Sequence, residues 1–422
     1  MTTIDDLFHE AGAGIERLGL AAIPFTESAS TPTNADQLDR VFTGRRQELK
    51  TVFTQFQGRD RRRILVSGRI GIGKSAFVLQ VLTALERNIP KLLPAYATLS
   101  AEANLTTTAF IALAYQLPKN RWAQSQLHQL GLPTAQPQKE RTSKIGISKL
   151  LTAEMSEKDR EPVRMERPTE ALQQLIEQAR DTYPGGIVIA IDDLDKQDPA
   201  RIRHLMHDAQ GTLKGTASFI LTGHPIGMMG DLLTSERGFF DCKIALDDLD
   251  QPTTQQMLAN YLASVRLNSD RPANQPPIPQ DFLPFTPDAA REFCRASQGK
   301  PRLFNRLGNT VLTTAIAHNA PKIDLAMLRE GLQASELSRR EQASLNLKEQ
   351  RLKQLLDERG TLSEETILLD DLESLGLRSF SDALPLLEKL EDADLANRNE
   401  LGYDTEFEPI NVDLPFSEPP NL

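Results

Sequence analysis

Residues 68–75 read Gly-Arg-Ile-Gly-Ile-Gly-Lys-Ser, so Gly68, Gly71 and Gly73 precede Lys74 and Ser75. Glycines at these positions let backbone N–H groups turn toward phosphate oxygens, and the helix expected to follow adds the positive end of its dipole. Lys74 would bridge the phosphates with its charge, and the Ser75 hydroxyl would bind Mg²⁺. The pattern predicts a P-loop, the Walker A motif, that binds ATP with Mg²⁺.

Two carboxylates follow the apolar run 187–191. Asp192 stands at its end, in the Walker B position, and is predicted to orient Mg²⁺ through water. Asp193 comes next and is a candidate general base for the attacking water. Asp195 is a further candidate. For Asp193 and Asp195 the alternative is that the side chain only caps the following turn.

The elements that must hold these residues alternate along the chain. Short apolar runs typical of buried strands are separated by patterns with one apolar helical face, the first of them at residues 74–88. Such an order predicts an α/β fold with a parallel sheet covered by helices on both faces. The expected strands are residues 64–67, 95–99, 187–191, 218–221 and 243–246, and the other expected helices are 106–117 and 169–182.

Composition divides the chain further. We expect an N-terminal extension to residue 40, an ATPase core over 41–270, a helical lid over 271–334 and a last domain over 335–422. About fifty residues, 118–168, interrupt the core. This segment is polar and basic, contains Trp122 and is long for a connection, so we interpret it as an insertion. It is either a solvated surface excursion or a DNA contact.

The last domain has the order of a winged helix: helices over 345–358, 363–375 and 381–395, then a hairpin around Gly402. It carries 9 Lys/Arg against 21 Asp/Glu, whereas the whole chain has a net charge of −10. Acidic groups repel phosphate, and DNA binding needs cations that release counterions. We therefore expect this domain to bind protein, either a partner or its own core.

Any DNA contact is expected from the near-neutral remainder, with the basic insertion and an arginine run as first suspects: Arg59, Arg61, Arg62 and Arg63. The alternative is that the run is a solvated approach to the first strand.

The sequence also indicates a cytoplasmic protein. No run approaches the roughly 18 apolar residues of a membrane span, and the first ten residues are acidic, unlike a signal or transit peptide. Its two cysteines, Cys242 and Cys294, lie in apolar runs and are expected to be buried thiols.

Five features together resemble AAA+ ATPases of the origin-recognition and initiator branch. The chain is also similar to ExeA-like secretion ATPases, transposition ATPases and STAND signalling ATPases. Besides Walker A and Walker B, these features are a Gly-Arg-x-x-Glu-Leu box at 44–49, a sensor 1 strand at 219–225 and a sensor 2 helix at 297–307. The resemblance covers roughly residues 40–332.

The resemblance implies further roles. Arg45, in the Gly-Arg box, would lie beside the adenine. Thr222 would hydrogen-bond the attacking water or the γ-phosphate as sensor 1, with His224 as the alternative. Arg302 would reach the γ-phosphate from the lid. Arg237 would be the arginine finger that enters a neighbour's site, which implies a homo-oligomer.

Asp193 departs from the glutamate usual in the family and is one methylene shorter, so we expect slow hydrolysis. The predicted function is a nucleotide-driven conformational switch in a bacterial multiprotein system, either a DNA transaction or phage defence and signalling. One alternative is a DNA-binding initiator or transposition-type ATPase. The other is a nucleotide-gated scaffold with negligible hydrolysis.

Overall fold

The computed structural model describes residues 4–26, 38, 40–57, 61–100, 103–134, 165–194, 199–223, 240–266, 275–342, 346–364, 366–392, 395–398 and 402–404. The chain forms two compact units. The first, called here the sheet unit, consists of residues 28–264 and 271–275. The second, the helical unit, consists of residues 1–27, 265–270 and 276–422.

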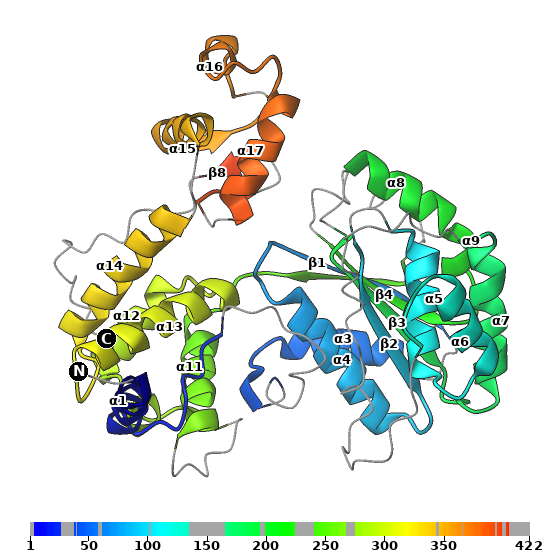
Figure 1. Ribbon diagram of the computed structural model, residues 1–422, viewed down its shortest axis with the longest axis horizontal. Helices are drawn as coiled ribbons and strands as arrows, with labels where there is room; N and C mark the ends of the chain where they lie inside the picture. The colour runs from blue at the N-terminus through cyan, green and yellow to red at the C-terminus, as the bar shows by residue number, and fades with distance from the viewer. Residues whose placement is uncertain are drawn as a thin grey trace. The chain divides into compact units, whose positions relative to one another are not determined.

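The sheet unit is built on a five-stranded sheet with the order β2-β3-β4-β1-β5 (Figure 1). Every pair of neighbouring strands is parallel. The α/β prediction is therefore confirmed, and each strand overlaps an expected range. The strands are β1 (Arg63–Gly68), β2 (Leu93–Thr98), β3 (Ile187–Asp192), β4 (Ser218–Gly223) and β5 (Cys242–Leu246).

Helices cover both faces of this sheet, because alternate residues of a strand point to opposite faces. Ile64 and Val66 pack on the face covered by α3 (Arg46–Gln55) and α4 (Lys74–Asn88). Leu65 packs on the opposite face. The helices of that face are α5 (Leu105–Gln116), α6 (Arg121–Gln129), α7 (Pro168–Arg180), α8 (Pro199–Asp208) and α9 (Gln210–Leu213).

The first part of the predicted insertion belongs to the core. Ala123 and Leu127 of α6 are buried in the same cluster as α5 and α7. Trp122 packs edge-on against Phe110, with ring centroids 5.8 Å apart. The polar composition of this segment hid these apolar contacts, so its first part packs in the core. Residues 135–164 lie outside the described part.

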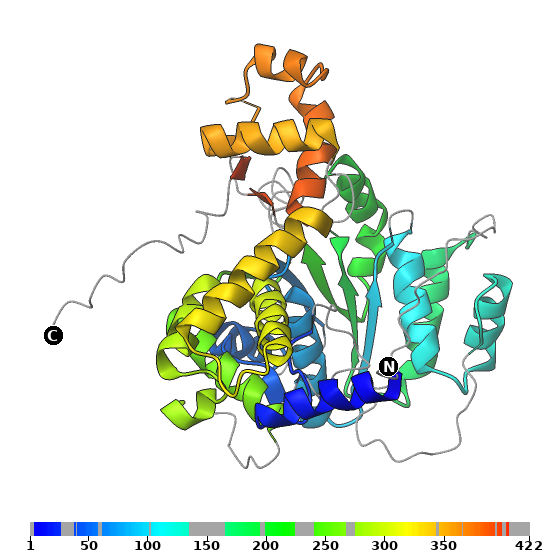
Figure 2. The ribbon, with the colours of Figure 1, turned by 60° about the vertical axis from the view of Figure 1, so that its left-hand side comes forward.

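Residues 4–26 of the predicted N-terminal extension belong to the helical unit. In the helical unit, α1 (Ile4–Arg17) and the segment after it pack on α13 (Pro301–Ala317) (Figure 2). Phe25 lies in an aromatic cluster with Phe293 and Phe304, and a Cβ on Gly308 would stand 2.5 Å from its ring. The other helices around this core are η4 (Pro279–Phe282), α12 (Pro287–Ala296) and α14 (Leu325–Gln342).

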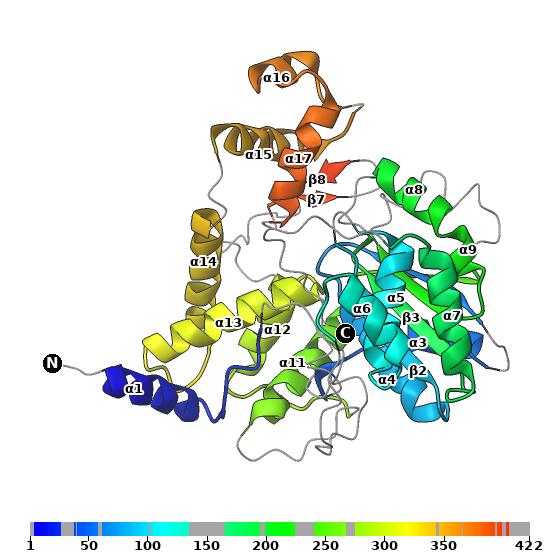
Figure 3. The same ribbon diagram turned by 45° about the vertical axis from the view of Figure 1, so that its right-hand side comes forward.

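The end of the helical unit has its own hydrophobic cluster, centred on fully buried residues such as Leu352, Leu387 and Leu390. The order along the chain is helix, strand, two helices and two strands (Figure 3), and the strands form an antiparallel sheet of order β6-β8-β7. These elements are α15 (Leu347–Arg359), β6 (Thr361–Leu362), α16 (Leu369–Ser374), α17 (Phe380–Asp392), β7 (Asn397–Arg398) and β8 (Tyr403–Asp404). The second helix starts later than expected because Ser363 and Thr366 close a turn before it.

Both cysteines are free thiols. Cys294 is buried as expected, and burial raises its pKa to about 12. Cys242 is only half-buried because it lies on the edge strand β5. No helix in the described part of the chain is long and apolar enough to cross a membrane.

Candidate functional site

The glycine-rich segment forms a tight loop between β1 and the 15-residue helix α4. Gly71 and Gly73 adopt left-handed conformations, with φ of 79° and 96°, that side chains disfavour. A Cβ on Gly68 would lie 2.8 Å from the Ile72 side chain and 2.9 Å from the Leu246 carbonyl oxygen. These glycines are therefore required by the path of the backbone.

Lys74 starts α4 and is 7% exposed. Its Nζ donates to the carbonyl oxygens of Gly68 (2.9 Å) and Arg69 (3.2 Å). The ammonium therefore lies within the curve of the loop, at the N-terminus of a long helix. A loop of this kind fits a chain of phosphates, which would accept from the lysine and from the backbone N–H groups.

The Gly-Arg box lies against this loop. Arg45 is itself in a left-handed conformation (φ 58°), pairs with Glu48 at 3.5 Å and approaches the Ile72 carbonyl oxygen at 3.5 Å. Burial lowers the pKa of Arg45, although Glu48 acts in the opposite direction. A Cβ on Gly44 would lie 2.6 Å from Thr253 of α11 (Gln251–Val265). Arg45 therefore supports the phosphate loop.

The carboxyl ends of β3 and β4 bring Asp192 and Thr222 together. Asp192 is 1% exposed and Thr222 is fully buried. The Thr222 hydroxyl donates to Oδ1 of Asp192. On the other side, Tyr96 of β2 donates its hydroxyl to Oδ2 of Asp192 at 2.6 Å.

Asp193 has a left-handed backbone (φ 63°), which is uncommon for a residue with a side chain. This turn aims its N–H at Asp192 Oδ1 and at Thr222 Oγ1, both at 3.1 Å. The backbone conformation of Asp193 is therefore part of the arrangement around Asp192.

Of the remaining predicted residues that the structure describes, Ser75 adjoins this loop and Arg302 lies in the other unit. Ser75 lies in the first turn of α4. Arg302 belongs to the helical unit, where it is exposed in the first turn of α13. Asp195, His224 and Arg237 lie outside the described residues.

Sequence reasoning missed Tyr96. The available signal was one tyrosine inside the apolar run that ends at residue 99. In the structure, Asp192 pairs with Thr98 of β2, and Tyr96 lies two residues before Thr98 on that strand. Strand order is what makes this signal meaningful, and the sequence alone did not supply it.

The arginine run has a structural explanation that sequence reasoning did not find. Arg61 donates to two backbone carbonyls just after α9, at 2.6 and 3.0 Å. Arg62 is 7% exposed and its Nε donates to the Gln55 carbonyl at 2.6 Å. Arg63 pairs with Asp241 at 3.3 Å. Arg62 is buried, Arg63 is partly buried and Arg61 is exposed, and all three lie at the amino ends of the strands, opposite the phosphate loop. Arg59 lies outside the described residues.

Comparison with known families places the loop, Tyr96 and Asp192 in one domain. The AAA ATPase domain matches residues 41–213, which include Arg45, the phosphate loop and Asp192. Residues 41–213 are an AAA ATPase domain. The predicted resemblance to AAA+ P-loop ATPases is confirmed for this part of the chain. No curated protein matches the chain in sequence.

Solved structures are also similar to this chain beyond residues 41–213. The ORC1 protein of Aeropyrum pernix, solved in complex with DNA, has 15% identity and a TM-score of 0.50, with 90% of this chain and 93% of that chain covered. The RuvB Holliday junction branch migration motor of Thermotoga maritima has 13% identity and a TM-score of 0.42, covering 91% and 96%. At such identity the ORC1 match concerns the fold alone.

Proposed function

We propose that the chain binds ATP with Mg²⁺ at the phosphate loop, hydrolyses it slowly and uses the cycle as a conformational switch in a multiprotein system. One observation carries this proposal: the buried Lys74 ammonium lies inside a glycine loop at the N-terminus of α4.

The residues of the site fit a nucleotide and its metal. Lys74 and the N–H groups of the loop would hold the β- and γ-phosphates, and the Ser75 hydroxyl together with Asp192 would hold Mg²⁺, which supplies charge neutralisation when bound. Asp193 would accept a proton from the attacking water. Its carboxylate is short and its backbone is fixed by two hydrogen bonds, which supports slow turnover.

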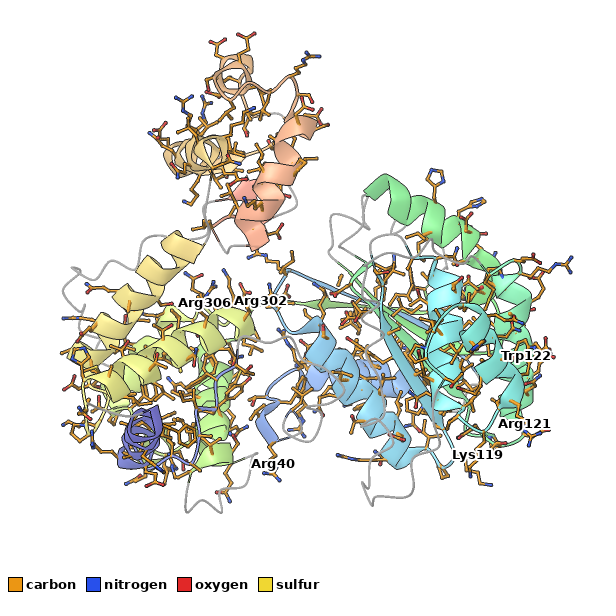
Figure 4. All side chains as sticks on the ribbon, in the orientation of Figure 1. Arg40, Lys119, Arg121, Trp122, Arg302 and Arg306 are labelled. Atoms are coloured by element: carbon orange, nitrogen blue, oxygen red, sulfur yellow. The ribbon has the colours of Figure 1, made fainter. Side chains whose placement is uncertain are left out.

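In the proposed switch, the helical unit changes conformation with the bound nucleotide. Arg302 and Arg306 project from one side of α13, a turn apart (Figure 4). We propose Arg302 as the arginine that responds to the γ-phosphate, and Arg237 as a finger acting on a neighbouring copy. Phosphate contacts that order separate segments are a recurrent switching device.

The last domain is proposed to bind protein. Its order of helices and strands supports a winged helix, in which the third helix would enter a DNA groove. In α17, however, the single cation Lys389 donates to both oxygens of Glu349 at 2.9 Å. That pair leaves exposed Asp382 among the charges the helix presents. An acidic surface suits a basic partner protein better than DNA.

Purified protein tests the proposal through ATP affinity and turnover over a range of protein concentrations. We expect binding that depends on Mg²⁺, and slow turnover that rises with concentration because a neighbour completes the site. Fast turnover that does not depend on protein concentration would contradict two parts of the proposal: Arg237 acting on a neighbouring copy, and Asp193 as an inefficient general base. Binding with no turnover at any concentration would favour the scaffold alternative.

A further inference from the structure

Asp192 is held from both sides of its own strand. β3 lies between β2 and β4 in the sheet, and the three hydrogen bonds to the Asp192 carboxylate come from β2, from β4 and from the next peptide. Oδ1 accepts from Thr222 and from the N–H of Asp193. Oδ2 accepts from Tyr96. An ionised carboxylate offers about four acceptor positions, so among the described residues these bonds leave one of them, on Oδ2.

Strand register explains why Tyr96 reaches this carboxylate. Tyr96 pairs with Ala190, and Asp192 follows Ala190 by two residues on the same face of β3. The small Ala190 side chain leaves room for the ring, which is packed in the core on the α4 side of the sheet. A phenol is protonated at neutral pH, so the Tyr96 hydroxyl can donate to Oδ2 of Asp192.

The same bonds limit what Thr222 can do. A threonine hydroxyl carries one hydrogen, and in Thr222 that hydrogen is directed to Asp192. Its oxygen already accepts from the N–H of Asp193. In this arrangement the hydroxyl supports the carboxylate and has no hydrogen left for a phosphate.

We propose that Tyr96 is a positioning residue for the metal-binding carboxylate. Together with Thr222, it fixes the rotamer of Asp192 so that one acceptor position on Oδ2 remains for Mg²⁺ or its water. This inference rests on the proposed function. It adds a residue from β2 to a site whose other groups come from β1, β3 and β4, and it gives Thr222 a supporting role in place of direct contact with the γ-phosphate.

The test is the Mg²⁺ dependence of ATP affinity in the full chain, measured by calorimetry for wild type and Tyr96→Phe. The substitution keeps the ring and removes the bond to Oδ2. Loss of a hydrogen-bond partner that orients a metal ligand typically lowers metal affinity by 10–100-fold. The Mg²⁺ concentration that gives half of the maximal increase in ATP affinity should therefore rise about tenfold or more in Tyr96→Phe. ATP affinity in EDTA should stay within about twofold, because Lys74 and the loop are untouched.

Tyr115→Phe is the matched control. Tyr115 is a partly buried residue of α5 that packs against the core on the other face of the sheet. It should leave the Mg²⁺ dependence unchanged. Thr222→Val, which removes the other hydroxyl, should shift it in the same direction as Tyr96→Phe. In an Asp192→Asn background, Tyr96→Phe should have no further effect.

The outcomes separate the inference from the proposed function. An unchanged Mg²⁺ dependence in both Tyr96→Phe and Thr222→Val, with wild type binding ATP and responding to Mg²⁺, would overturn the inference alone. Equal loss of affinity with and without Mg²⁺ would show a general packing role for Tyr96 and would also overturn it. A wild-type protein that binds no ATP at all would refute the proposed function first.

Discussion

The two edges of the central sheet carry similar residue types and use them differently. At the carboxyl edge, Lys74 is buried in the glycine loop and Asp192 is buried at the end of β3. At the amino edge, Arg61, Arg62 and Arg63 all donate to protein groups, chiefly backbone carbonyls and one carboxylate. A charged side chain at one end of the strands therefore has a functional or a structural role according to which backbone groups, N–H or carbonyl, lack hydrogen-bond partners there.

This comparison explains why a basic run is a poor indicator of DNA binding. The start of a parallel strand exposes carbonyls from preceding helices, and arginine, with five N–H donors, satisfies several at once. The end of a strand that leads into a glycine loop instead presents N–H groups, which attract anions.

Lys74→Ala gives the largest expected difference between the edges. ATP affinity should fall about 100-fold or more, because hydrogen bonds from a charged group contribute about 1.5–3 kcal/mol each. Equilibrium binding of labelled ATP measures this loss. The thermal unfolding midpoint of the nucleotide-free protein should change far less. Undiminished affinity in a folded variant would refute the phosphate-loop assignment.

Arg62→Ala should do the reverse. It removes a buried guanidinium and leaves the Gln55 carbonyl without its bond from Nε, at a cost of about 1–3 kcal/mol of unfolding free energy. Urea denaturation measures this cost, while ATP affinity should stay at the wild-type value. Arg61→Ala, at an exposed arginine with comparable backbone bonds, should cost less. A drop in ATP affinity with Arg62→Ala would contradict the purely structural role of arginines at the amino edge.

Asp193 separates side-chain from backbone effects at the carboxyl edge. Asparagine tolerates the left-handed conformation, so Asp193→Asn should retain stability and ATP binding while turnover falls about 100-fold, as expected on loss of a general base. Asp193→Ala should show the same loss of turnover as Asp193→Asn, and its free energy of unfolding should also fall by about 1 kcal/mol. Single-turnover assays and urea denaturation distinguish the two. If turnover survives in Asp193→Asn, another residue is the base.

The smallest effect is a pH dependence at the amino edge. Burial acts to raise the pKa of Asp241, but hydrogen bonds from the backbone and side chain of Arg63 outweigh it, so the pKa is lowered. A lowered folded-state pKa stabilises the fold above the unfolded value of about 3.9, and this stabilisation is lost as pH falls through the folded value. Asp241→Asn should flatten the fall in urea midpoint below about pH 4. An identical slope in wild type and variant would argue against the ion pair.

Much of the sheet unit followed from local pattern. The helix expected over residues 74–88 is α4, and the strand expected over 187–191 is β3 with one further residue. Glycine, lysine and serine at fixed spacing sufficed for the phosphate loop, because its geometry is encoded within eight consecutive residues.

Features that depend on contacts distant in sequence escaped prediction. Tyr96 matters only because β2 pairs with β3, a relation between residues 96 apart along the chain. Trp122 appeared to belong to a polar insertion because its neighbours along the chain are polar, whereas its neighbours in space are apolar. The roles of Arg45, Arg302 and Arg237 remain predictions drawn from resemblance.

The packing of residues 4–26 on the lid helices also bears on how the protein is made. Thr26 donates its N–H to Asn305 across 279 positions of sequence, so residues 4–26 meet these partners only after the sheet unit has been synthesised. The entropy of closing so long a loop grows only slowly with length, and the sheet unit shortens the effective span when it folds within it. Until residues 293–304 leave the ribosome, Phe25 has no aromatic neighbours to join. Completion of the helical unit is therefore expected to follow synthesis of the sheet unit.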